Sequence, residues 1–170
     1  VNDNGEIDID EFKKNITEKT KLIAFTHISN VTGSIMPVKK IIEMAKTKNI
    51  PVLIDGTQGA PHAVLDVQDL DCDFYAISCH KMYGPNGLGI LYAKKKWLDE
   101  LPPYQGGGGM ISEVKKDDIS YAELPNKYEA GTMQTAEVVA FAKSIEFIQD
   151  LGIKNIDCLL YTSDAADDAN

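Results

Sequence analysis

The sequence has no long apolar run, and it is poor in cysteine and in basic residues. A membrane-spanning helix needs about 20 consecutive apolar residues, and no run of that length occurs, so we expect no membrane association. The 3 cysteines are irregularly spaced and form no CxxC pair, which argues against a disulfide framework and a cysteine-based metal site. No secretory signal is visible in the polar start of the chain. We therefore expect a reducing, cytoplasmic setting.

Basic residues are too few for a nucleic-acid-binding surface. The chain has 17 Lys and Arg against 26 Asp and Glu, and the formal net charge of −9 would repel a phosphate backbone. We expect no nucleic-acid partner. A local cationic pocket for one small phosphate stays compatible with this charge.

The length of 170 residues suits one soluble domain with a core. The first residue is Val rather than Met, so we expect the chain to begin inside a longer protein. We predict one partial domain over residues 1–157. Residues 158–170 are rich in Asp and Ala and have no amphipathic period. We expect them to be either non-native adaptor sequence or a disordered acidic tail, and we assign them no function.

Apolar runs predict four strands and amphipathic periods predict helices. The strands are expected near residues 22–26, 51–54, 74–77 and 89–93. Pro37 opens a helix, a short helix follows from Lys95 to Leu101, and a third helix spans residues 135–151 with Gly152 as its stop. The stripe of the first helix is Val38, Ile41, Ile42 and Ala45, and that of the last is Val138, Phe141, Ala142, Ile145 and Ile148.

This order predicts an α/β domain with a mostly parallel sheet and flanking helices. The apolar strands are typical of a sheet covered on both faces. Polar clusters follow three of the predicted strands, at residues 30–33, 55–58 and 78–81. Ligands of open α/β sheets bind beyond the carboxyl ends of the strands, so these clusters mark a candidate site.

The clusters contain the groups that pyridoxal phosphate (PLP) requires. This cofactor needs a lysine for a Schiff base, an acid against its pyridine nitrogen, a donor near its ring oxygen and donors for its phosphate. Each residue alone is explained as well by an ordinary turn, and only their occurrence together favours a cofactor site. The candidates are Lys81 for the Schiff base, Asp55 for the nitrogen, Gln58 for the ring oxygen, and Ser78 and His80 for the phosphate.

Five stretches resemble the class V aminotransferase family of fold-type I PLP enzymes, and they are most similar to SufS-type cysteine desulfurases. The resemblance implies that this chain is part of the PLP-binding large domain. It implies the same roles for Lys81, Asp55, Gln58, Ser78 and His80. The stretches are HISNVTGSIMPV (27–38), VLIDGTQGAPH (52–62), DCDFYAISCHKMYGPNGLGILY (71–92), GGGGMI (106–111) and YEAGTMQT (128–135).

The resemblance also implies two further cofactor contacts and a partner subunit. Asn30 matches an asparagine near the ring oxygen and the substrate carboxylate. Thr132 matches a threonine that reaches the phosphate bound by the other subunit, so a homodimer is expected. Residues 106–110 resemble the family's interface hairpin.

The implied reaction converts L-cysteine to L-alanine and transfers the sulfur to an enzyme cysteine. The sulfur then passes to an acceptor protein of the Suf system for iron–sulfur cluster assembly. The family's sulfur-accepting cysteine and carboxylate-binding arginine lie in a downstream small domain, and its ring-stacking histidine lies in an upstream segment. Because no residue here matches them, we expect the 170-residue chain alone to be inactive.

Two alternatives stay open. The first keeps the PLP site but changes the reaction to that of an aminotransferase, a kynureninase-like hydrolase or a selenocysteine lyase. The second is a truncated chain that folds poorly and binds nothing, because missing strands expose sheet edges.

Overall fold

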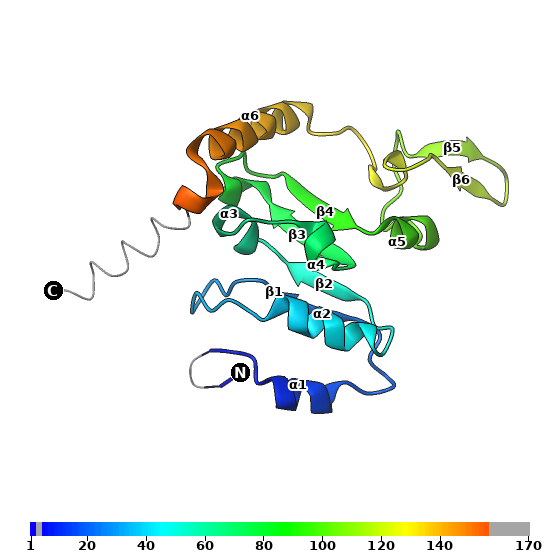
Figure 1. Cartoon of the computed structure of the whole chain (residues 1–170). Coiled ribbons are helices and arrows are strands. Elements are labelled where there is room, and N and C mark those ends of the chain that lie inside the picture. The colour runs from blue at the N-terminus through cyan, green and yellow to red at the C-terminus, as the bar shows by residue number, and fades with distance from the viewer. Residues whose placement is uncertain (3–4, 157–170) are drawn as a thin grey trace.

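The main sheet has the strand order β1-β2-β3-β4 in the computed structural model, which describes residues 1–2 and 5–156 (Figure 1). The first three strands are parallel and β4 runs antiparallel to β3, so the predicted α/β class with a mostly parallel sheet is confirmed. An apolar run does not encode direction, and the sequence alone therefore did not predict the reversal at β4. The strands are β1 (Ile23–Thr26), β2 (Val52–Asp55), β3 (Phe74–Ser78) and β4 (Gly89–Ala93).

One face of this sheet, here called the core face, packs against α2 (Val38–Lys46). Val52, Ile54 and Tyr75 point to this face and are almost fully buried. All of the predicted apolar stripe of α2 is buried, as its spacing of three and four residues requires. Figure 1 shows α1 and α2 at the β1 side of the sheet and α6 at the β4 side.

The opposite face, here called the open face, is less covered than the core face. Residues alternate between the two faces along a strand, so Ala24, Asp55 and Leu91 point away from the core face. All three are exposed. The prediction of a sheet covered on both faces is therefore wrong for the described part of the chain.

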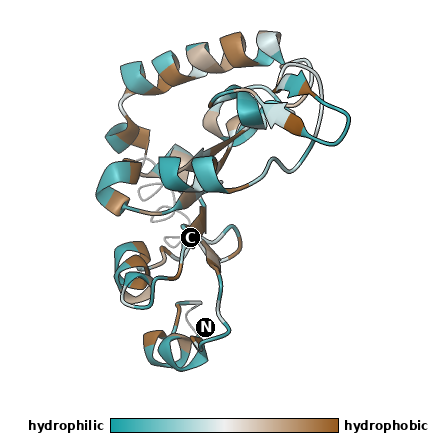
Figure 2. Cartoon of the chain, turned by 90° about the vertical axis from the view of Figure 1, so that its right-hand side faces the viewer, coloured by the Kyte–Doolittle hydropathy of each residue, from teal (hydrophilic) through white to brown (hydrophobic). Residues whose placement is uncertain are grey.

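Helix α6 (Thr135–Leu151) packs on the turn after β3 along a narrow line. Phe141 and Ile148 are buried, but Val138, Ala142 and Ile145 are exposed, so the predicted stripe is only partly correct. The Ser144 hydroxyl donates to the Tyr83 carbonyl at 3.0 Å. Contact with a turn covers less of a helix than contact with a sheet face would. Figure 2 accordingly shows hydrophobic and hydrophilic residues alternating around this helix.

The remaining elements are short. The α5 helix (Lys95–Glu100) agrees with the sequence prediction, and the glycine loop 106–109 leads into a two-stranded hairpin. Helix α1 (Ile9–Asn15), capped by the Asp8 side chain, was not predicted. No helix in the described ranges is long and apolar enough to cross a membrane. The others are α3 (Gly59–His62), α4 (Val67–Leu70), η1 (Cys79–Met82), β5 (Ile111–Val114), β6 (Ile119–Tyr121) and η2 (Asn126–Tyr128).

Candidate active site

The carboxyl ends of β2 and β3 lie side by side, because Asp55 pairs with Ala76 in the register of the sheet. Paired residues of neighbouring strands point to the same face, and so do residues two apart on one strand. Asp55 and Ser78 therefore both lie on the open face. The structure brings these two predicted site residues to the same end and the same face of the sheet.

The turn after β3 carries the predicted lysine. Ser78 is the last residue of β3, and its hydroxyl lies 2.8 Å from Nδ1 of His80. Lys81 is half-buried, and its amine makes no hydrogen bond or ion pair with any residue in the described ranges. Tyr83 ends the turn in the left-handed region at φ 57°. We call residues 79–83 the lysine turn.

The loop after β2, residues 55–59, is here called the aspartate loop. Oδ1 of Asp55 accepts a hydrogen bond from the Thr57 amide at 3.0 Å, and within the described ranges the carboxylate forms no ion pair. Gln58 is half-buried at the start of α3, and its side chain does not cap that helix. The carboxylate and the amide thus keep hydrogen-bonding capacity for a ligand.

The other two predicted residues lie in loops. Asn30 is exposed in the segment that follows β1, at the same end of the sheet as Asp55. Thr132 is exposed and lines a hollow of about 420 Å³ together with the start of β4. Gly89, the first residue of β4, pairs with Ser78, so this hollow also lies toward the candidate site. No hydrogen bond among the described residues joins Lys81 to Asp55, Asn30 or Thr132.

Sequence reasoning missed two aromatic residues beneath the aspartate loop. The Tyr75 hydroxyl lies 2.8 Å from Nδ1 of His27, and the two rings meet edge to face. The residues are 48 positions apart in the chain, so no local pattern links them. The available signal was the pair of glycines, Gly56 and Gly59, whose lack of a side chain leaves room for these rings.

A family model described as aminotransferase class-V matches residues 1–160. This chain belongs to the class V aminotransferase family. Enzymes of the family use PLP, in agreement with the cofactor predicted from the sequence. The family predicted from the motifs is confirmed.

Curated class V relatives of this chain are named as cysteine desulfurases. A "probable cysteine desulfurase" of Halalkalibacterium halodurans is 46% identical over 153 residues, which are 90% of this chain and 38% of the relative. A cysteine desulfurase of Escherichia coli is 41% identical over 157 residues, or 92% of this chain and 39% of the relative. The chain thus spans well under half the length of these relatives.

Two solved structures of cysteine desulfurases have a fold similar to that of this chain. The cysteine desulfurase CsdA of Escherichia coli superposes with a TM-score of 0.83 at 40% identity, covering 87% of this chain and 37% of that one. The apo cysteine desulfurase of Thermococcus onnurineus NA1 superposes with a TM-score of 0.89 at 31% identity, covering 99% and 43%. Both neighbours support the assignment of this class V chain to the fold of the family.

The side chains of this class V chain fit the needs of PLP. Lys81 offers an amine that no described carboxylate holds, and Asp55 offers a carboxylate that no described cation neutralises. Ser78 and His80 offer a hydroxyl and a ring nitrogen in mutual contact, which suits a phosphate. No group of three or more His, Cys, Asp or Glu side chains in the described ranges could hold a metal ion.

The described cysteines do not suit sulfur chemistry. Cys72 and Cys79 are both free and fully buried. Burial raises the pKa of each thiol, and the thiol rather than the reactive thiolate is therefore favoured. Cys79 lies inside the lysine turn as a packing residue, as the sequence predicts. Cys158 lies outside the described residues, as does the tail 158–170.

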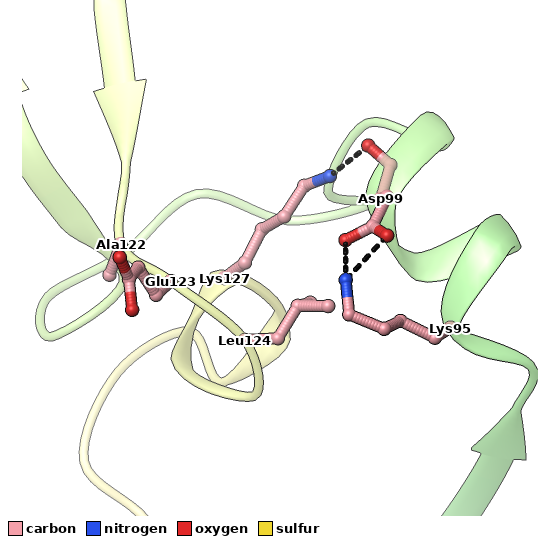
Figure 3. Close-up of a pocket in the computed structure, with 6 residues that line it drawn as sticks. All are labelled: Lys95, Asp99, Ala122, Glu123, Leu124 and Lys127. Carbon is pink, nitrogen blue, oxygen red and sulfur yellow. Dashed lines mark hydrogen bonds and ion pairs between the residues drawn. The ribbon is translucent and has the colours of Figure 1, made fainter.

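A second hollow, of about 410 Å³, lies between α5 and residues 122–127 (Figure 3). Lys95, Asp99 and Lys127, three of its four charged side chains, already have partners in the structure. Lys95 donates to both carboxylate oxygens of Asp99 at 2.8 and 2.6 Å, and Lys127 donates to two carbonyl oxygens at the end of α5. Helix α5 directly follows β4, whose last residue pairs with the first residue of β3. This hollow is therefore at the opposite end of the sheet from Lys81.

Proposed function

We propose that this chain is the cofactor-binding part of a PLP-dependent cysteine desulfurase. The reaction would convert L-cysteine to L-alanine and transfer the sulfur to a cysteine of the enzyme. One observation carries the proposal. A half-buried lysine without a partner in the described ranges follows β3 directly, where the neighbouring strand ends in an unneutralised carboxylate.

Each site residue would have one task. PLP, when bound, would supply an electron-accepting ring that stabilises negative charge on the substrate α-carbon. Lys81 would hold the cofactor covalently through its aldehyde and, once released by substrate, would take the α-proton on Nζ. Asp55 would hold a proton on the pyridine nitrogen, and Gln58 and Asn30 would donate near the ring oxygen. Ser78, His80 and Thr132 would bind the phosphate.

The sulfur transfer needs a second thiol. A cysteine thiolate of the enzyme would attack the substrate sulfur and form an S–S bond, while the C–S bond breaks and its electron pair stays on carbon. Proton uptake at that carbon would complete L-alanine. The raised pKa values of Cys72 and Cys79 argue against either as this nucleophile. We therefore expect no turnover from the 170-residue chain alone.

The cellular setting is proposed in the same way. We propose a cytoplasmic homodimer that passes sulfur to an acceptor protein of the Suf system for iron–sulfur cluster assembly. The names of the relatives support desulfurase chemistry. Size-exclusion chromatography with light scattering would test the dimer, and sulfur transfer to candidate acceptors would test the partner.

The cofactor assignment has a direct test. The purified 170-residue chain is incubated with PLP, reduced with borohydride and digested, and the modified lysine is found by mass spectrometry. We expect one strongly labelled site at Lys81, which is absent in Lys81→Ala and unchanged in Lys21→Ala. Lys21 is an exposed lysine with no partner in the described ranges and is the matched control. Equal labelling of the Lys81→Ala chain would rule out the assignment.

The reaction is tested in a chimaera. Residues 5–156 replace the matching segment of the Halalkalibacterium halodurans relative, which supplies the rest of a full-length protein. We expect the chimaera to release alanine from L-cysteine and to lose this activity with Lys81→Ala. A chimaera that folds and binds PLP but transaminates or hydrolyses its substrate would favour another class V reaction.

A further inference from the structure

Two buried rings join the ends of three strands beneath the aspartate loop. Tyr75 in β3 is the largest fully buried side chain of the described residues, and its hydroxyl contacts His27 at 2.8 Å. His27 directly follows β1, and its own amide donates to the carbonyl of Asp55 at 2.8 Å. The pair therefore ties β1, β2 and β3 together where the aspartate loop begins.

The backbone of the aspartate loop rests on these rings. A Cβ added at Gly56 would lie 1.8 Å from Cε1 of Tyr75. A Cβ added at Gly59 would lie 2.5 Å from Nδ1 of His27 and 2.8 Å from the Tyr75 hydroxyl. Such distances leave no space for any side chain. Two glycines three residues apart thus let the loop approach the pair closely.

The loop presents opposite sides to the pair and to the candidate ligand site. Tyr75 lies on the core face, and the Asp55 side chain lies on the open face. Burial raises the pKa of Tyr75 and lowers that of His27, and both groups are therefore neutral near neutral pH. A neutral pair can support the loop without placing a competing charge behind the carboxylate.

We propose that Tyr75 and His27 are positioning residues of the cofactor site, and that their hydrogen bond fixes the backbone of residues 55–59. This inference rests on the function proposed above. The fixed backbone determines where the Asp55 carboxylate and the Gln58 amide meet the cofactor ring. Both rings lie on the core face and the Asp55 side chain lies on the open face, so the pair would act on the cofactor only through the loop.

The test compares two tyrosines in the 170-residue chain. Tyr75→Phe removes one hydroxyl and keeps the ring that fills the space below Gly56. Tyr92→Phe is the matched control, because Tyr92 pairs with Tyr75 across the β3–β4 register and its hydroxyl has no hydrogen bond in the described ranges. PLP affinity is measured by titration. We also measure the pH midpoint of the bound cofactor's visible absorption, which responds to the carboxylate at the ring nitrogen.

We expect Tyr75→Phe to weaken PLP binding by about three- to tenfold, as for loss of one buried hydrogen bond, and to shift the pH midpoint. Tyr92→Phe should change neither. His27→Gln should shift the midpoint as well, and adding Tyr75→Phe to it should have little further effect, because the two residues act as one unit. A lower melting temperature with unchanged affinity and midpoint would overturn the inference.

Hydrogen exchange separates this inference from the proposed function. In the chain without cofactor, the Gly56 amide donates to Ala76 and the Ala60 amide donates to Gly56. Both should exchange about three- to tenfold faster in Tyr75→Phe than in Tyr92→Phe. Unchanged exchange would refute the inference. Loss of Lys81-specific labelling in the parent chain would instead refute the proposed function.

Discussion

The two ends of the main sheet use their charged side chains in different ways. At the amino end of the parallel strands, the Asp73 carboxylate accepts hydrogen bonds from the Val52 amide at 3.0 Å and the Trp97 indole at 2.8 Å. Lys94 donates to the Asp71 carbonyl and carboxylate. At the carboxyl end, neither Asp55 nor Lys81 forms an ion pair within the described ranges.

This difference separates stabilising charges from charges kept for a ligand. Burial alone would raise the pKa of Asp73, but hydrogen bonds from Trp97 and Val52 hold it below the usual value. That carboxylate therefore favours the folded state. A partner for Lys81 would add stability in the same way but would occupy the amine. Sites that bind ligands commonly give up stability of this kind.

The largest expected effect comes from exchanging the two carboxylates for alanine. Asp73→Ala leaves the buried Val52 amide and the Trp97 indole without their acceptor, and should lower the free energy of unfolding by about 2–4 kcal/mol. Asp55→Ala removes one exposed turn contact and should cost under about 1 kcal/mol. Urea denaturation of the cofactor-free chain measures both.

Asp73→Asn is the matched control, because it keeps one carbonyl acceptor and should fall between the two. Equal losses for the Ala variants at positions 55 and 73 would remove the distinction between the two ends of the sheet.

A smaller effect is expected from two half-buried lysines, Lys94 and Lys81. Lys94→Met breaks the contacts with Asp71 and Asp73, and should destabilise the chain by about 1–2 kcal/mol. Lys81→Met breaks no polar contact with the described residues and should be neutral or slightly stabilising, while it abolishes labelling by PLP. Thermal unfolding under identical buffer conditions compares them. A clear loss of stability in Lys81→Met would show that this lysine is structural.

The smallest effect is a change of stability with pH. Hydrogen bonds from Lys46 and Lys94 lower the pKa of Asp71 from 3.8 to about 2. The stabilisation is therefore complete above about pH 4 and is lost as the pH falls toward 2. The side chain is half-exposed, so the contribution should stay below about 1 kcal/mol. Unfolding experiments between pH 2 and 5 should show a weaker slope in Asp71→Asn than in the control Asp69→Asn, and equal slopes would contradict the assignment.

The sequence predicts those features that depend on neighbouring residues. The α2 stripe and the Gly152 stop needed only local spacing, and both are confirmed. The signals for α1 are also local, with Asp8 as N-cap and acidic residues in the first turn, but this helix of 7 residues has no buried residue and therefore no apolar stripe that marks it. Which residues of α6 are buried depends on its contact with a turn about 60 residues away in the chain. The apolar stripe predicted for this helix from local spacing is therefore only partly correct.

The site follows the same rule. Strand ends and polar clusters are local features of the sequence, so the sequence predicts that Asp55 and Ser78 lie at the same end of the sheet. The pairing of His27 with Tyr75 is not a local feature, because it depends on the register of three strands. The roles of all the predicted site residues stay predictions, as does the domain boundary at residue 157. These residues are Asn30, Asp55, Gln58, Ser78, His80, Lys81 and Thr132.

The antiparallel direction of β4 has a consequence for how the site assembles. β3, the lysine turn and β4 form one continuous hairpin, in which Ser78 pairs with Gly89 and the Cys79 amide donates to the Leu88 carbonyl. Contacts of such short range close early and at low entropic cost, whereas the pairing that aligns Asp55 spans a longer segment. Lys81, Ser78 and His80 would thus be preassembled by a single local unit, and the Asp55 carboxylate would join them only when the parallel strands dock.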